Sequence, residues 1–350
     1  MTMDGVKPSR TSLIAFPLIE RSAASPSATS IDVARCAGVS QSTVSLVLSG
    51  KAQGRVSEAT QERVRECARE LCYLPNVAAQ TLRLGSSRAV ALLVPDVTNP
   101  FFGRVLRGAQ RAAQAAGYTV ALVDTGRGRW EEQSFEALRA GPVDGYLLFQ
   151  VTPPEALERD QRVVLIETEA TGRPSVRFDI DAGATAAFTH LVELGHRRIG
   201  HLAAAWDAPT FHARDAARRR VLTEAGVDPD EQPRVTTPIG IEDAHEAAGE
   251  LLADSPTAVF CDDDFIAAGL YLAARERGIR IPADLSVVGF DDMDFARVLE
   301  PPLTTVALDA EQLGATAFEL LEVRMGGRRT RRRVVLPAEL RVRGSTSAPR

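Results

Sequence analysis

Hydrophobic residues follow two different patterns along the chain, and the change falls near residue 89. Between residues 29 and 74 they recur every three or four positions, which predicts three short amphipathic helices. From residue 89 onwards, short continuous apolar runs alternate with helical stretches. That alternation is typical of parallel strands that are covered by helices on both faces. The pattern therefore predicts a small helical domain followed by a larger α/β domain.

The α/β part divides into two similar halves. Its predicted strands are residues 89–95, 119–123, 145–149, 162–166, 198–202, 257–261 and 285–289. Its predicted helices are residues 101–116, 131–139, 182–193, 213–225, 244–253, 265–277 and 312–325, followed by short strands. Each half is expected to form a doubly wound parallel sheet, and the two halves are expected to enclose a cleft at the carboxyl ends of their strands, where small ligands bind.

The first two helices surround a tight turn. Thr29 can cap the first helix, and Asp32 can complete a capping box with it. Gly38 supplies the permissive backbone of the turn, and Ser40 can cap the second helix, as Ser57 can cap the third. The apolar faces of the pair are formed by Val33, Ala34, Ala37, Val44, Val47 and Leu48, which leaves Gln41, Ser42, Ser45 and Leu46 free to contact another molecule. Such a helix pair can place its second helix in the major groove of DNA.

Composition and charge agree with this division. A length of 350 residues indicates two or three domains, and a hydrophobic content of 45% is enough to build full cores. The net charge is −5, yet residues 30–88 carry eight Lys and Arg against five Asp and Glu. A mildly basic module thus precedes an acidic remainder, which favours local contact with phosphates by that module alone. Residues 1–28 lack periodicity and predict a disordered tail, and no apolar run suits a membrane helix or an export signal, so we expect a cytoplasmic protein.

Cysteines and histidines give no pattern typical of a metal site. The four cysteines, Cys36, Cys67, Cys72 and Cys261, are expected to be small buried hydrophobic residues in a reducing compartment. A redox pair of Cys36 with Cys67 or Cys72 is the alternative. Nucleophile elbows, Walker loops and dinucleotide fingerprints are also absent, so we expect no metal, no cofactor and no enzymatic activity.

Ordered short motifs carry a resemblance that covers residues 29–345. They are DVAR (32–35), AGVS (37–40), STVS (42–45), GRVS (54–57), YLPN (73–76) with Leu82, VPDVTNPFF (94–102), LGHRRI (194–199), SVVGFDD (286–292) and PPLTT (301–305). In this order and spacing they resemble the LacI/GalR family of transcriptional regulators. The resemblance implies an all-α helix-turn-helix headpiece, a hinge helix and a core like that of periplasmic sugar-binding proteins. It also implies homodimers that bind pseudopalindromic double-stranded operators under the control of a small effector.

Domain boundaries follow from the resemblance. They are a tail at 1–28, a headpiece at 29–74, a hinge helix and linker at 75–87, and a core at 88–345, whose N-subdomain is about 88–168 plus 301–327 and whose C-subdomain is about 169–300 plus 328–345. The basic run at 328–333 is interpreted as a solvated crossover or dimer edge. Because no heptad repeat follows the core, a dimer is favoured over a tethered tetramer.

The resemblance assigns DNA contacts to the second helix and to the hinge. Gln41, Ser42 and Leu46 would read base edges, with Gln41 suited to adenine. Most relatives carry arginine at position 46; leucine would offer an apolar contact such as one to a thymine methyl group, and the alternative is a core-facing leucine. Phosphate contacts would come from Ser40, Thr43, Ser45 and Arg55. Hinge contacts would come from Asn76, Ala79 and Leu82, with Leu82 as a minor-groove wedge, or alternatively as a linker residue that covers domain surface.

The resemblance also assigns effector contacts at the strand ends. These residues are Asp96, Asn99, Phe102, Glu167, Arg214, Asp263, Asp264 and Asp291. Phe102 would stack on a ring, and Arg214 would make a forked contact. Two alternatives are that Asp96 only forms a turn and that Asp264 only caps a helix. The adjacent Asp262 is expected to face water. An acid-rich cleft argues against an anionic effector and suits a neutral sugar or polyol, or a cationic amine.

The sequence therefore predicts a ligand-controlled transcriptional repressor. A solute-binding protein would share the core, but the headpiece and the lack of an export signal oppose that class. An enzyme on an α/β core is opposed by the missing catalytic motifs.

Overall fold

The computed structural model describes residues 28–73, 86–126, 141, 143–150, 162–168, 172–328, 330 and 332–350. The chain forms two compact units, of which the smaller ends at residue 83 and the larger begins at residue 84. The predicted tail up to residue 27, the predicted hinge residues Asn76, Ala79 and Leu82, and the predicted helix at 131–139 lie outside the described residues.

The smaller unit consists of α1 (Ser30–Ala37), α2 (Gln41–Leu48) and α3 (Glu58–Glu70). The predicted capping box is confirmed, because the Asp32 amide donates to the Thr29 hydroxyl and the Thr29 amide donates to the Asp32 carboxylate at 2.9 Å. The hydroxyls of Ser40 and Ser57 cap α2 and α3 as predicted. Gly38 has a φ of 65° at the turn, a conformation that disfavours other residues.

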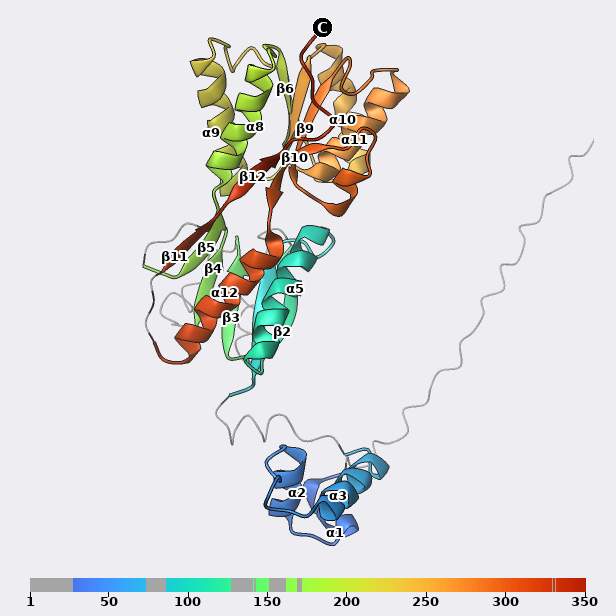
Figure 1. Cartoon of the computed structure of the whole chain (residues 1–350), viewed down its shortest axis with the longest axis vertical. Coiled ribbons are helices and arrows are strands. Elements are labelled where there is room, and N and C mark those ends of the chain that lie inside the picture. The colour runs from blue at the N-terminus through green and yellow to red at the C-terminus, as the bar shows by residue number, and fades with distance from the viewer. Residues whose placement is uncertain are drawn as a thin grey trace, which may run out of the picture. The chain divides into compact units, whose positions relative to one another are not determined.

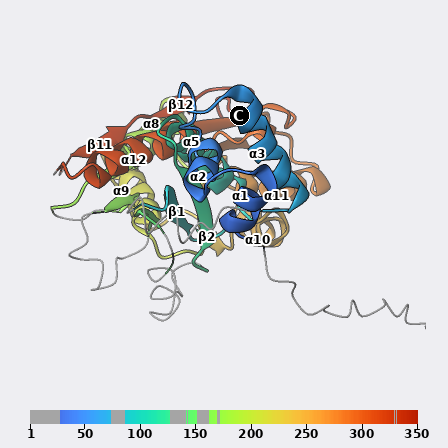
Figure 2. The ribbon, with the colours of Figure 1, turned by 90° about the horizontal axis from the view of Figure 1, so that it is seen from below.

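The three helices pack together around a small core (Figure 2). The core comprises Val33, Ala34, Ala37, Val44, Val47, Ala52, Val64, Cys67 and Ala68. Leu48, predicted on the same face, is half-buried against it. A core of this size buries little apolar surface, so additional links between the helices contribute strongly to stability.

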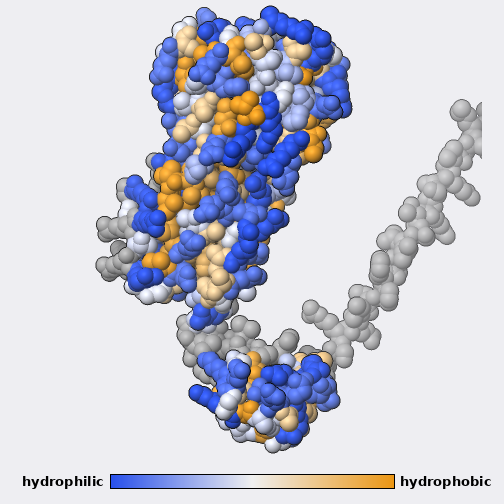
Figure 3. Space-filling model, in the orientation of Figure 1, coloured by the Kyte–Doolittle hydropathy of each residue, from blue (hydrophilic) through white to orange (hydrophobic). Residues whose placement is uncertain are grey.

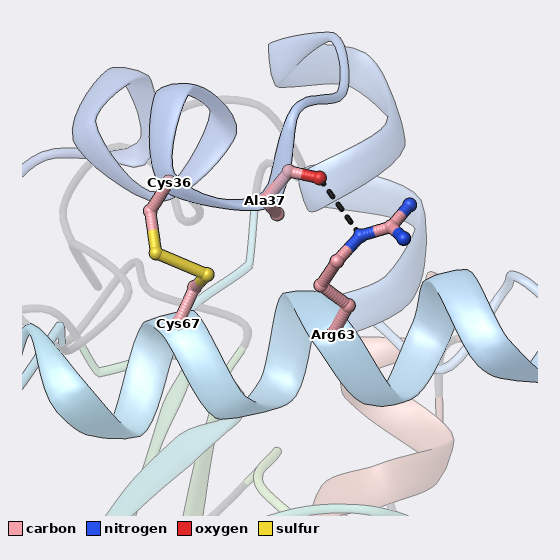
Figure 4. The surroundings of a disulfide bond; sticks show 4 residues. All are labelled: Cys36, Ala37, Arg63 and Cys67. Atoms are coloured by element: carbon pink, nitrogen blue, oxygen red, sulfur yellow. Dashed lines mark hydrogen bonds between the residues drawn. A yellow bond between two sulfur atoms is a disulfide. The ribbon is translucent and has the colours of Figure 1, made fainter.

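A disulfide joins α1 to α3. Cys36 and Cys67 are bonded, and Figure 4 shows this bond beside a hydrogen bond of 3.0 Å from the Arg63 Nε to the Ala37 carbonyl. The expectation of four buried free thiols was wrong for three of them: Cys36 is exposed, Cys67 is bonded and Cys72 is free but exposed, whereas Cys261 is buried and free. Of the two pairings that were considered as the alternative, the structure forms Cys36 with Cys67, because α1 packs against α3.

The described residues of the larger unit form two six-stranded sheets (Figure 1). The first has the order β11-β5-β4-β3-β1-β2, and the second β12-β10-β9-β8-β6-β7. The strands are β1 (Ala89–Val94), β2 (Thr119–Asp124), β3 (Gly145–Phe149), β4 (Val163–Ile166), β5 (Ser175–Phe178), β6 (Ile199–Ala204), β7 (Arg234–Thr237), β8 (Ala258–Cys261), β9 (Ser286–Asp291), β10 (Thr304–Leu308), β11 (Arg333–Leu336) and β12 (Ala338–Arg341). All pairs are parallel except β10 with β12. The predicted parallel α/β class is confirmed.

The helices of the larger unit are α5 (Pro100–Ala115), α8 (Ile180–Glu193), α9 (Pro209–Glu224), α10 (Ile241–Ala253), α11 (Asp264–Glu276) and α12 (Ala310–Met325), with a short 3-10 helix η1 (Asp294–Arg297). Helices α5 and α12 lie side by side in Figure 1 and approach closely at two glycines. A Cβ atom on Gly108 would overlap the Glu311 carbonyl, and one on Gly314 would overlap the Val105 carbonyl. Within the described residues, no helix combines the length and the apolar character that crossing a bilayer requires.

The chain crosses between the sheets later than predicted. Strand β5 lies in the first sheet, although residues 169–300 were expected in the C-subdomain, and β10 lies in the second sheet, although residues 301–327 were expected in the N-subdomain. The basic run that starts at Arg328 connects α12, which packs on strands of the first sheet, to β11 of the same sheet. It is therefore not a crossover between the two sheets. Apolar runs identify strands, but the sheet that a strand joins depends on pairing with distant residues. Strands β5 and β7 were not predicted, because each spans only four residues and includes polar ones.

The start of the larger unit is fastened by Asp144. Its carboxylate accepts hydrogen bonds from the Ser87 amide at 2.8 Å, the Ser87 hydroxyl at 2.9 Å and the Arg88 amide at 3.0 Å, and also from the Ser86 hydroxyl. Partial burial raises the pKa of Asp144, but these hydrogen bonds outweigh it and hold the pKa below its usual value. The segment that follows the predicted hinge is therefore tied to the loop before β3.

Candidate DNA-binding surface and ligand cavity

The start of α2 presents a row of short polar side chains. The Ser40 hydroxyl accepts from the Thr43 amide at 3.2 Å and lies 2.8 Å from the Ser42 hydroxyl. The Gln41 amide group donates to the Ser30 hydroxyl at 2.8 Å and so links the starts of α2 and α1. Reading a base with Gln41 would therefore exchange this hydrogen bond for one to DNA.

None of the predicted DNA contacts within the smaller unit belongs to its core. Ser40, Gln41, Ser42 and Arg55 are exposed, while Thr43, Ser45 and Leu46 are half-buried. Leu46 is not part of the core cluster, unlike its neighbour Val47, which is buried. The leucine is thus available at the surface as an apolar contact.

A cavity lies at the carboxyl ends of strands from both sheets. Its empty space is about 460 Å³, part of which is open to solvent. Six of the predicted effector contacts line it: Asn99, Phe102, Glu167, Arg214, Asp263 and Asp291. Asp96 and Asp264 are not among its lining residues.

The first sheet contributes an aromatic wall. Asn99 caps α5 by accepting from the Phe101 amide at 2.9 Å, which places the following residues of the helix against the cavity. The Phe102 ring meets the Phe149 ring edge to face at 5.0 Å between centroids. Such a wall can hold the apolar face of a ring.

Arg214 enters the cavity from α9 and is only 4% exposed. Its Nη1 donates to the carbonyl of Asp262, and its guanidinium lies 3.8 Å above the centre of the Phe290 ring. Two buried polar atoms that line or enter the cavity lack a hydrogen-bond partner among the described residues: Arg214 Nε and Gln150 Oε1. Unsatisfied buried polar groups are costly and commonly mark places where a ligand or water binds.

Three acids around the cavity have raised pKa values. Burial raises the pKa of Glu167 to about 7, although its carboxylate accepts from the Phe178 amide at 2.7 Å. Burial also raises the pKa of Asp263 to about 6. The pKa of Asp291 lies well above its usual value because of burial and the neighbouring Asp263.

Several lining residues have a strained backbone. Gln150, Glu167 and Asp291 have φ values of 51°, 52° and 111°, and each stands at or directly after the end of a strand. This left-handed region is unfavourable for residues other than glycine, and such strain gathers at functional sites. The strain here turns polar side chains toward the cavity.

Predictions for the remaining acids had mixed outcomes. Asp96 accepts from the Thr98 amide at 2.9 Å and so forms the turn that was considered as its alternative role. Asp264 does not cap α11, because Asp263 does so by accepting from the Phe265 amide at 2.7 Å. Asp264 is instead buried and accepts from the Met293 amide and the Thr305 hydroxyl, both at 2.7 Å.

The expectation that Asp262 faces water was wrong. Asp262 is 1% exposed, accepts from the Ala204 amide at 2.9 Å and lies 3.1 Å from His201 Nε2. Burial raises its pKa, but the adjacent His201 outweighs this effect and holds it below the usual value. An acidic run suggested solvation, whereas the end of the apolar strand β8 carries the residue inside.

Sequence reasoning missed most of the aromatic lining. The unpredicted lining residues include Phe149, Gln150, Phe178, Trp206, Phe211 and Ile239. Phe149, Gln150 and Trp206 stand at or shortly after predicted strand ends, so applying the strand-end rule to every strand would have found them.

Comparisons with known proteins agree with both units. A model of bacterial regulatory proteins of the lacI family matches residues 31–76, and a model of a periplasmic binding protein-like domain matches residues 188–346. The regulator DegA of Bacillus subtilis (strain 168) is 33% identical over 331 residues, covering 90% of this chain and 97% of DegA. The repressor CytR of Escherichia coli (strain K12) is 34% identical over 332 residues, covering 92% and 97%.

Solved structures extend this similarity. The lac repressor dimer bound to operator and the anti-inducer ONPF has 27% identity and a TM-score of 0.80, covering 92% of this chain and all of that chain. The complex of the regulator CelR with cellobiose has 30% identity and a TM-score of 0.67, covering 91% and 99%.

Proposed function

This chain belongs to the LacI family of bacterial regulatory proteins, and we propose that it represses transcription by binding an operator under the control of a small metabolite. Membership makes it a DNA-binding regulator and not an enzyme. One observation carries the proposal: a single chain joins a capped helix-turn-helix unit to a cavity lined from both sheets. A chain that contains both parts can bind a ligand in the cavity and DNA through the helix-turn-helix unit.

Operator recognition would come from α2. Gln41, Ser42 and Leu46 would contact base edges, and Leu46 suits a thymine methyl group because it is apolar and lies outside the core. Phosphate contacts would come from the other polar residues near this helix, Ser40, Thr43, Ser45 and Arg55.

Two hinge helices and two subunits complete the proposal. The family resemblance assigns minor-groove contacts to Asn76, Ala79 and Leu82, with Leu82 as a wedge. A pseudopalindromic operator would be bound by a homodimer. Exposed Val335 and Val342, and the hydrophobic patches on the face of the larger unit in Figure 3, support association of two copies. As a DNA-binding regulator it would act in the cytoplasm and on the nucleoid when bound to its operator.

The metabolite would be a sugar or a related compound. The solved complex of CelR with cellobiose supports this class, and so do the aromatic wall and the polar groups at the strand ends. Asn99, Phe102, Glu167, Arg214, Asp263 and Asp291 would contact it. Asp96 and Asp264 have structural partners and would act indirectly.

A gel-shift assay tests the function directly. The full chain, incubated with DNA from upstream of its own gene, should bind one palindromic site with an affinity that falls steeply with salt. A thermal-shift screen of sugars, polyols and amines should yield a compound that stabilises the protein and changes operator affinity. Failure to bind any palindromic fragment, or binding that ignores salt, would overturn the proposal.

Replacing Leu82 tests the wedge. Leu82→Ala should keep the oligomeric state, measured by light scattering, but lower operator affinity at least tenfold, because the kink in the DNA would lose its apolar support. An unchanged affinity would mean that Leu82 is only a linker residue.

A further inference from the structure

Acidic groups outnumber cationic groups in the cavity. Among its described lining residues, the acids are Glu167, Asp262, Asp263 and Asp291, and the cation is Arg214. Asp262 already has a partner in His201 at 3.1 Å. The charge balance of the ligand site therefore depends on the three remaining acids and the arginine.

None of these three acids has a cationic partner within 4 Å among the described residues. The Glu167 carboxylate accepts from a backbone amide, and the Asp263 carboxylate does the same. Asp263 and Asp291 lie beside each other in the cavity lining, and each raises the cost of ionising the other. Two buried carboxyl groups that adjoin each other do not readily ionise together without a cation, so in the empty cavity this pair retains one shared proton.

Arg214 does not neutralise this cluster directly. Its Nη1 is used by the carbonyl of Asp262, and its plane rests on the Phe290 ring. Its Nε is a buried donor without a partner among the described residues. It requires an acceptor, such as a hydroxyl group, from a ligand.

The side of the cavity that carries the acids requires hydrogen-bond donors from a ligand. Gln150 Oε1 is a buried acceptor that lacks a partner in the described part of the chain, and the carboxylates are acceptors as well. A ligand must therefore bring several donors to this side of the cavity. An ammonium group brings three donors and a positive charge, and the faces of Phe102, Trp206 and Phe211 suit the carbon skeleton that carries it.

We propose that the ligand is an amino sugar whose ammonium group lies among Glu167, Asp263 and Asp291 and whose hydroxyl groups reach Arg214. The amino-sugar proposal depends on the proposed function only because it takes the cavity as the site where the regulatory metabolite binds. A neutral sugar would leave the shared proton in place. An ammonium group would displace that proton to solvent and pair with the two carboxylates, so the aspartate pair releases one proton when one cation binds.

Binding of the amine should strengthen as the pH rises from 5 to 7. The groups that face the aspartate pair are Asp262, Asp264 and Arg214, and those that face Glu167 are Arg214 and Arg177. With pKa values of about 6 for Asp263 and about 7 for Glu167, the acids ionise across this range while a protonated amine keeps its charge. A neutral sugar should show no such increase.

Calorimetric titration of the full chain tests the proposal with matched probes. The probes are the 2-amino-2-deoxy forms of glucose, galactose and mannose, the parent hexoses, and the N-acetylated forms, which keep the ring but lose the charge. At least one amino hexose should bind tenfold or more tightly than its parent and its N-acetyl form. Titration in buffers of different ionisation enthalpy should show proton release only for the amino form.

Asp263→Asn supplies the matching variant. Its amide oxygen can still cap α11, so the fold should persist, which thermal unfolding checks. The preference for the amino form should fall below threefold and proton release should vanish, whereas Glu224→Gln, at the exposed far end of α9, should change neither.

The amine proposal is overturned if every parent hexose binds at least as tightly as its amino form, or if no amino hexose binds. The proposed function would then still stand, provided that the chain binds its operator and another compound of the screen alters that binding. Loss of operator binding itself would count against the function and not against the amine.

Discussion

In the smaller unit, the hydroxyls that start the helices are exposed and bond to backbone three residues away, whereas in the cavity the buried Glu167 carboxyl group bonds to the neighbouring strand β5. Left-handed backbone also differs between them. The smaller unit uses Gly38, Gly50 and Gly54 for most such positions, while the cavity uses Gln150, Glu167 and Asp291, where the conformation is costly. The helix-capping hydroxyls of the DNA-binding unit thus have local hydrogen-bond partners. The cavity contains polar atoms without such partners among the described residues, and a ligand can bind them.

This difference indicates where each region is vulnerable. The helical unit has few long-range links, so its stability depends on those few, such as the Cys36–Cys67 bond. The cavity has many long-range links, so a change there should alter ligand binding more than folding. The following predictions test this contrast from the largest expected effect to the smallest.

Loss of the disulfide should give the largest effect. Cys36→Ser opens a link that spans 31 residues, and such a crosslink contributes about 3 to 4 kcal/mol to the free energy of unfolding by restricting the unfolded chain. Urea unfolding followed by circular dichroism should show the loss in the helical unit alone. The exposed Cys72→Ser is the control and should change little. An equal loss of stability in both units would contradict the expected difference between them.

Removing the guanidinium from the cavity should come next. Arg214→Met keeps the apolar contact with Phe290 but removes the donors, and we expect the compound that alters operator binding to lose about 100-fold in affinity, or about 2.7 kcal/mol. Operator binding without ligand should persist. Arg219→Met on the same helix, where the arginine is exposed and paired with Asp230, is the matched control. A loss below threefold would show that Arg214 is structural.

Glu167 should make the larger unit less stable as the pH rises. Its pKa is about 7 in the folded chain against 4.5 in the unfolded chain, so the folded state holds the proton more tightly. Stability from this group is therefore present below pH 4.5 and is lost progressively up to pH 7, with a cost of about 3 kcal/mol. Thermal unfolding of Glu167→Gln should lack this part of the pH dependence. Parallel pH curves for both proteins would refute it.

Loosening the segment that follows the predicted hinge, at residues 86–88, should have the smallest effect. Asp144→Asn replaces a carboxylate that accepts from Ser87 and Arg88, and it should lower operator affinity about fivefold, near 1 kcal/mol, because the segment after the hinge would be less firmly held. Ligand affinity should stay the same. Asp181→Asn, an exposed residue paired with Arg220, serves as the control and should leave both affinities unchanged.

Local features were predictable from the sequence, since they depend on neighbouring residues. The capping box of Thr29 and Asp32, the caps at Ser40 and Ser57, and the buried faces of α1 and α2 were all predicted correctly. These signals act over a few positions, where spacing and propensity suffice. The family resemblance, and not spacing, supplied the six predicted residues that line the cavity.

Features that depend on distant pairing were not predictable. The sheet joined by β10 depends on β9 and β12, and the burial of Asp262 depends on Ala204 and His201. The bond between Cys36 and Cys67 requires the packing of α1 on α3, which no spacing rule encodes. A single sequence offers no direct measure of such contacts.

The interleaved strand order has a consequence for synthesis on the ribosome. Both sheets need strands from the end of the chain, because β11 at Arg333–Leu336 completes the first and β12 at Ala338–Arg341 the second. At typical elongation rates, the roughly 250 residues between β1 and β11 take about 10 to 50 s to emerge. The helical unit can fold during that interval, while the larger unit stays incomplete. A message cut short by a late stop codon would thus yield a nascent DNA-binding module without its sensor, a product that cellular proteases would have to remove.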